Sequence, residues 1–178
     1  MNPQEVFLRN EFFSMSLLAA TRRANIYTND VPESARRELH AILHQHLEEL
    51  SATYQGDVAE VEHVKNIEFI ANSVTRQFSE ILAEGKFRIG PAQKVLNLYL
   101  KYLWCAGYIV RPPHCPIDAI ILAKAKVKAS TPWTKMSSIP EYEEVIEKLK
   151  KVAANEPLAE WELRVYNQSD ALPFVNVT

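Results

Sequence analysis

The stretch that decides the fold reads Gly85-Lys86-Phe87-Arg88-Ile89-Gly90-Pro91 and leads into an apolar run that ends at Cys105. Two of the chain's four glycines stand in this stretch. A glycine and a proline directly before an apolar run indicate a turn followed by the first turn of a helix. Because the run is apolar on most sides of the expected helix, we predict that this helix lies at the centre of the core.

Helical spacing of apolar residues continues on both sides of this run. Four glycines are too few for the many tight turns of an all-β protein. We therefore predict an all-α fold, a compact bundle of about six to seven helices with a helix-hairpin-helix element at 78–105. Ser138 is expected to cap one of the helices. The predicted helices span 4–24, 32–50, 57–84, 91–105, 117–129, 141–153 and 158–166.

Charge is distributed unevenly along the chain. Residues 85–136 hold nine basic residues and one acidic residue, for a net charge of +8, whereas the rest holds 11 basic and 21 acidic residues, for −10. We divide the expected single domain, 1–178, into acidic helices at 1–84, a basic hairpin and core segment at 85–136, and acidic helices at 137–178. A basic block in an acidic protein favours a polyanion as partner. The alternative is that these cations pair with the acidic helices on either side.

Two short motifs within the basic block carry a resemblance to a known family. They are Ile89-Gly90-Pro91-Ala92-Gln93-Lys94 and Pro116-Ile117-Asp118. Residues 85–123 resemble the core of the helix-hairpin-helix DNA glycosylase family, whose hairpin reads hydrophobic-Gly-x-Gly-x-Lys, with Ala92 at the second glycine. The resemblance implies that Lys94 is a Schiff-base nucleophile and that Asp118 assists departure of the damaged base.

This interpretation makes the chain a DNA-binding protein of base-excision repair, with glycosylase or AP lyase activity and no cofactor. Free N–H groups and the helix dipole at the start of the helix after Gly90 would favour a phosphate. An ionised Asp118 would stabilise an oxocarbenium cation. The expected nucleic-acid contacts are Gly90, Arg88, Lys101, Lys124, Lys126 and Lys128, and the candidates for stacking on a base are Tyr102, Tyr108 and Trp133.

The same residues also have ordinary structural interpretations. Gly90 then starts a core helix, Lys94 and Lys101 are surface lysines, and Asp118 caps a helix. In that case the chain is a non-enzymatic helical adaptor or regulatory protein that binds a protein partner. DNA binding near physiological salt, together with light scattering, distinguishes the two functions.

Weaker patterns bear on metals and on location. His40, His44 and Glu48 recur every four residues, as ligands of zinc sites do, but no motif supplies a third ligand, and we predict no metal. Cys105 and Cys115 are too few for an iron–sulfur cluster and are expected to be reduced. Charges within the first apolar stretch exclude a secretory signal peptide, and no uncharged run approaches the length of a membrane span. We expect a cytoplasmic protein without membrane contact.

Overall fold

The computed structural model describes residues 1–168, which form seven α-helices and no sheet. This confirms the all-α prediction. None of the helices in this part of the chain has the length and apolar content needed to cross a membrane. The predicted acidic C-terminal segment extends to 178, and its residues 169–178 lie outside the described residues. The helices are α1 (Pro3–Thr21), α2 (Glu33–Ser51), α3 (Glu60–Phe78), α4 (Ile89–Cys105), α5 (Ala119–Lys124), α6 (Ile139–Ala153) and α7 (Leu158–Asn167).

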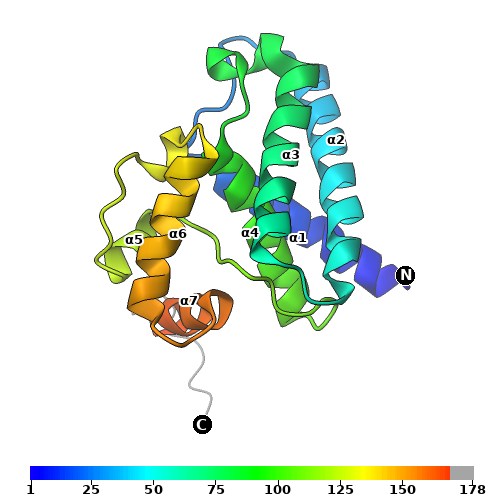
Figure 1. Cartoon of the computed structure of the whole chain (residues 1–178). Coiled ribbons are helices and arrows are strands. Elements are labelled where there is room, and N and C mark those ends of the chain that lie inside the picture. Colours follow the sequence, from blue (N-terminus) through cyan, green and yellow to red (C-terminus); the bar gives the residue numbers. More distant parts are fainter. Residues whose placement is uncertain (169–178) are drawn as a thin grey trace.

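Helix α4 lies at the centre of the fold, as its composition predicts. Every residue from Ile89 to Lys101 is buried. Helices α1, α2 and α3 pack on one side of α4, and α6 packs on the other with α5 and α7 nearby (Figure 1). Each fully buried Leu or Val side chain on α4, such as Val95 or Leu100, contributes about 1.5–3 kcal/mol through burial.

The third helix is shorter than predicted. It ends at Phe78 rather than continuing to 84, and two short 3₁₀ turns follow it. The backbone here pairs with the connection between α1 and α2: the Thr28 amide donates to the Ile81 carbonyl at 2.9 Å, and the Ala83 amide donates to the Ile26 carbonyl at 2.9 Å. These bonds take the groups that a continuing helix would need, so tertiary pairing ends α3 early.

The fifth helix is also shorter than the predicted span 117–129, because α5 ends at Lys124. Two residues later, Lys126 takes a left-handed conformation with φ +54°, which a helix cannot continue through. Asp118 begins the helix as its N-cap, and its Oδ1 accepts a hydrogen bond from the Ile121 amide at 2.9 Å. The capping role considered for Asp118 is therefore real.

Glu141 holds the segment between α5 and α6 in place through hydrogen bonds. Its carboxylate accepts hydrogen bonds from the Thr131 hydroxyl at 2.6 Å and from the Ser137 and Ser138 amides at 2.8 and 3.0 Å. These bonds, with that of Thr131 foremost, lower the pKa of Glu141 to about 2. Ser138 is the N-cap of α6, as predicted, and it also forms a capping box with Glu141.

The segment between α5 and α6 packs over the start of α4. Its 3₁₀ turn η4 (Trp133–Lys135) lies so near Gly90 that a Cβ atom there would come within 1.7 Å of the Trp133 carbonyl oxygen. The Gly90 amide donates to the Met136 carbonyl at 3.0 Å. Glycine is needed at 90 for this close approach of two backbones.

Candidate functional site

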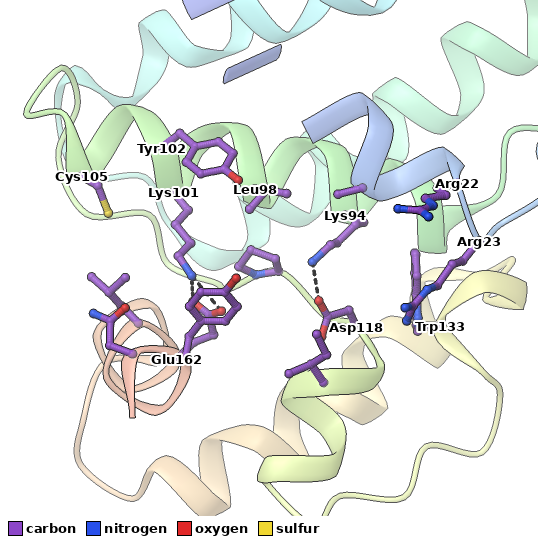
Figure 2. Close-up of a pocket in the computed structure, with 16 residues that line it drawn as sticks. Arg22, Arg23, Lys94, Leu98, Lys101, Tyr102, Cys105, Asp118, Trp133 and Glu162 are labelled. Carbon is purple, nitrogen blue, oxygen red and sulfur yellow. Dashed lines mark hydrogen bonds and ion pairs between the residues drawn. The ribbon is translucent and has the colours of Figure 1, made fainter. Parts of the chain in front are cut away.

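A pocket of about 530 Å³ lies along one face of α4, with further walls from α1, α5, η4 and α7 (Figure 2). Four basic and two acidic side chains line it, which leaves an excess of two positive charges. Apolar and aromatic side chains line the remainder. A concave, largely apolar pocket with a few charged groups is typical of a ligand site. The charged lining residues are Arg22, Arg23, Lys94, Lys101, Asp118 and Glu162.

The structure brings Lys94 and Asp118 together in this pocket. Lys94 Nζ donates to Asp118 Oδ2 at 2.8 Å, and the two side chains are 7% and 23% exposed. Burial raises the pKa of Asp118, but the Lys94 ammonium and hydrogen bonds from Lys94 and the Ile121 and Ile120 amides outweigh it and hold the pKa below its usual value. Asp118 is therefore ionised at neutral pH and faces the pocket as a carboxylate.

A second ion pair lies two turns further along α4. Lys101 Nζ contacts Glu162 Oε1 at 2.9 Å and Oε2 at 2.7 Å, and the side chains are 10% and 5% exposed. Burial raises the pKa of Glu162 despite the lowering effect of Lys101. The ring of Tyr166 lies 4.5 Å from the Lys101 ammonium. Lys94 and Lys101 thus lie on one face of α4, which forms the pocket wall, and each lysine meets a carboxylate from a different helix or helix cap (Figure 2).

Two arginines at the end of α1 supply the excess positive charge. Arg22 and Arg23 are exposed, line the pocket and lie near Lys94 and Trp133 (Figure 2). Within residues 1–168, no carboxylate comes within ion-pair distance of either guanidinium. Neither arginine was among the site residues predicted from the sequence. The available signal was an adjacent pair of cations closing the first predicted helix of an otherwise acidic segment.

The predicted phosphate-binding hairpin is not exposed, so Gly90 and Arg88 are not available for the expected nucleic-acid contacts, and Lys101 is not available to a DNA backbone. Gly90 is buried under η4, and its amide is used by Met136. Arg88 is 7% exposed, and its guanidinium donates to the Ala24 and Asn25 carbonyls. Lys101 pairs with Glu162 and faces the pocket, so it does not lie on the outer surface where a DNA backbone would contact it.

The other predicted contacts are placed as follows. Lys124, Lys126 and Lys128 are exposed and make no ion pair with a carboxylate in the described residues. Of the stacking candidates, Tyr102 and Trp133 line the pocket. Tyr108 does not, because it lies in a different part of the surface, where Arg9 covers its ring at 5.5 Å.

The residues considered for metal binding have other partners. The His40 ring bonds to the Tyr27 hydroxyl at 2.8 Å, and the His44 ring stacks on Phe13 at 4.4 Å. Residues 1–168 contain no group of three or more metal-ligating side chains. Cys105 is an exposed free thiol and Cys115 a buried one.

Glu162 was also missed from the sequence, although a signal exists. Leu158, Trp161, Glu162 and Val165 follow helical spacing, so the carboxylate falls on the apolar face of the last helix. A carboxylate in that position requires a buried partner.

Comparison with known proteins supplies no relative from which roles could be transferred: no family model, no curated protein and no solved structure matches the chain.

Proposed function

We propose that this chain binds DNA, accepts one extruded nucleotide in the α4 pocket, and excises its base with Lys94 and Asp118 as a glycosylase or AP lyase. The observation that carries the proposal is the 2.8 Å contact between Lys94 Nζ and Asp118 Oδ2 in a pocket of about 530 Å³ with excess positive charge. The resemblance of residues 85–123 to helix-hairpin-helix DNA glycosylases supports the same assignment of these two residues.

The pocket suits a nucleotide in size and in charge. Its volume lies within the range of about 300–1,000 Å³ that is usual for small-molecule sites. The planar guanidinium groups of Arg22 and Arg23 match phosphate oxygens. Tyr102 and Trp133 offer aromatic surface for an unstacked base. Lys124, the last residue of α5, and Lys126 and Lys128 just after it are exposed and extend the basic surface for the DNA backbone.

The ion pair has the groups that base excision needs. As the glycosidic bond breaks, its electron pair leaves with the base, and the Asp118 carboxylate stabilises the positive charge that develops at C1′. Lys94 gives a proton to the departing base. The electron pair of the resulting neutral amine then forms the new bond to C1′. The attached nitrogen loses a proton, the C1′–O4′ bond breaks as O4′ takes up a proton, and the nitrogen lone pair completes the C=N bond of the Schiff base.

Borohydride trapping tests this chemistry. The wild-type chain is expected to form a covalent adduct with DNA that carries an abasic site, because borohydride reduces the Schiff base to a stable amine. Lys94→Gln is expected to abolish the adduct, and Asp118→Asn to slow base excision about 100-fold, since an electrostatic contact to the transition state is lost. Lys151→Gln, an exposed lysine of α6 outside the pocket, is the matched control and should trap normally. Equal trapping by Lys94→Gln would rule out Lys94 as the nucleophile.

DNA affinity is expected to depend on salt through the exposed lysines. Neutralising Lys124, Lys126 and Lys128 together should weaken binding and reduce the slope of log affinity against log salt by up to about 3, since each phosphate contact contributes about 0.9 to that slope. Fluorescence anisotropy with a labelled duplex measures this. A control that neutralises Lys65, Arg76 and Lys151 changes the net charge equally and should bind like the wild type. The same loss in both triple variants would show that net charge alone controls binding.

A second candidate function is the adaptor role, and one observation favours it. Helix α1 exposes apolar side chains, with Phe7 62% and Leu18 60% exposed. Monomeric proteins bury such groups where they can, so an exposed apolar face is typical of a protein interface. Absence of DNA binding near physiological salt, together with self-association detected by light scattering, would support the adaptor over the enzyme.

A further inference from the structure

The proposed chemistry leaves one pair of charged groups in the pocket without a role. Lys94 and Asp118 would act at the sugar, whereas Lys101 and Glu162 lie in the same pocket and face it from its other end (Figure 2). The two lysines are seven residues apart on α4, which corresponds to about 10 Å along the helix axis. A nucleotide whose sugar lies at Lys94 would therefore direct its base toward Lys101 and Glu162.

The Lys101–Glu162 pair retains hydrogen-bonding capacity toward a ligand. A carboxylate offers about four acceptor positions, and Glu162 uses two of them, one on each oxygen, for Lys101 Nζ. Within residues 1–168, no other donor bonds to Glu162. Lys101 has three N–H donors, and its ammonium lies over the ring of Tyr166, which also lines the pocket.

We infer that Lys101 and Glu162 form hydrogen bonds with the edge of the extruded base and select guanine, an inference that rests on the proposed function. A carboxylate only accepts hydrogen bonds, so the base must present N–H donors to Glu162. Guanine presents two adjacent donors, N1–H and the N2 amino group, which match the two carboxylate oxygens in a bidentate contact. Its O6 acceptor lies beside N1–H, within reach of the Lys101 ammonium.

The other bases fit this pair less well. Adenine and cytosine each present one amino group next to a ring acceptor, so only one oxygen of Glu162 would be used. Thymine presents a single N–H between two carbonyl oxygens, one of which would face the carboxylate and be repelled. A contact of this kind discriminates between bases by about 5- to 150-fold in affinity.

Free nucleotides test the inference without any step of catalysis. In an NMR titration of the isotope-labelled chain, guanosine 5′-monophosphate should bind about tenfold more tightly than the adenosine, cytidine and thymidine monophosphates. Glu162→Gln should abolish this preference and shift it toward adenosine, because a glutamine amide pairs with the donor and acceptor of adenine. Glu160→Gln, on the same helix but outside the pocket, should keep the guanine preference.

Two further measurements keep the inference falsifiable. If Glu162→Gln does not fold, the double variant Lys101→Met, Glu162→Met replaces the buried pair with apolar groups of similar size and should fold without base preference. Abasic-site DNA has no base to read, so its binding reports on the proposed function alone. A chain that binds abasic-site DNA but takes all four nucleotides equally overturns the guanine inference only. A chain that binds neither abasic-site DNA nor any of the nucleotides overturns the proposed function as well.

Discussion

Replacing Gly90 with alanine is expected to lower the free energy of unfolding by about 3 kcal/mol or more, which is a large fraction of the stability of a domain this size. The added methyl group would lie 1.7 Å from the Trp133 carbonyl oxygen and 2.9 Å from its carbonyl carbon. Both are backbone atoms, so relief requires η4 to move away from α4. That movement would also break the hydrogen bond between the Gly90 amide and the Met136 carbonyl.

Urea denaturation of the variant beside Gly56→Ala measures this effect. A Cβ at Gly56 meets no atom within 4 Å, and its φ of −129° suits any residue, so that control should unfold near the wild-type midpoint. Trp133 lines the pocket, and displacing η4 should therefore also change its fluorescence in the folded Gly90→Ala variant. Equal midpoints for the two variants would show that η4 does not pack on Gly90.

The sequence predicted the helices well, because apolar spacing and capping residues are local signals. The buried run of α4 and the cap at Ser138 follow from residues close in the chain. The errors arose where distant segments meet. The pairing that ends α3 at Phe78 and the closure of η4 over Gly90 depend on tertiary contacts that no local pattern encodes.

The candidate site was predictable only in part, for the same reason. A family resemblance singled out Lys94 and Asp118, and helical spacing put Lys101 on the same face as Lys94. The hairpin itself was misjudged, because a glycine that begins a helix looks the same in sequence whether its amide meets a phosphate or another carbonyl. Arg22 and Glu162 come from opposite ends of the described chain, so only the packing of α1 and α7 beside α4 brings them to the pocket.

Acid is expected to destabilise the folded chain through two buried histidines. His63 and His114 lie edge to face with ring centroids 4.9 Å apart, and the Nδ1 atom of each bonds to a tyrosine hydroxyl, that of Tyr54 at 2.7 Å and that of Tyr142 at 2.8 Å. Burial, reinforced by the neighbouring His114, lowers the pKa of His63 to about 3. Burial and the Lys150 ammonium lower the pKa of His114 to about 3, although Glu60 lies 3.9 Å from its Nε2.

The direction of this pH effect follows from whether the folded or the unfolded chain binds more protons. Below the ordinary pKa of 6.5, the unfolded chain protonates both histidines while the folded chain does not, so stability is complete above that pH and falls as pH decreases toward about 3. Well below pH 6.5, each histidine contributes about 1.4 kcal/mol per pH unit, or about 2.8 kcal/mol per pH unit for the pair.

Urea unfolding between pH 6 and pH 5 measures this effect, because most carboxylates titrate below that range. His40 and His46, whose pKa values burial also lowers, add to the slope with the same sign. His63→Gln removes one of the two buried rings and should reduce the slope by about 1.4 kcal/mol per pH unit, even though the variant starts from a lower stability. The comparison uses the slope rather than the stability itself, so the lost Tyr54 hydrogen bond does not obscure it. An unchanged slope in His63→Gln would mean that the folded chain already protonates this histidine, and that the pair is not buried in a neutral state.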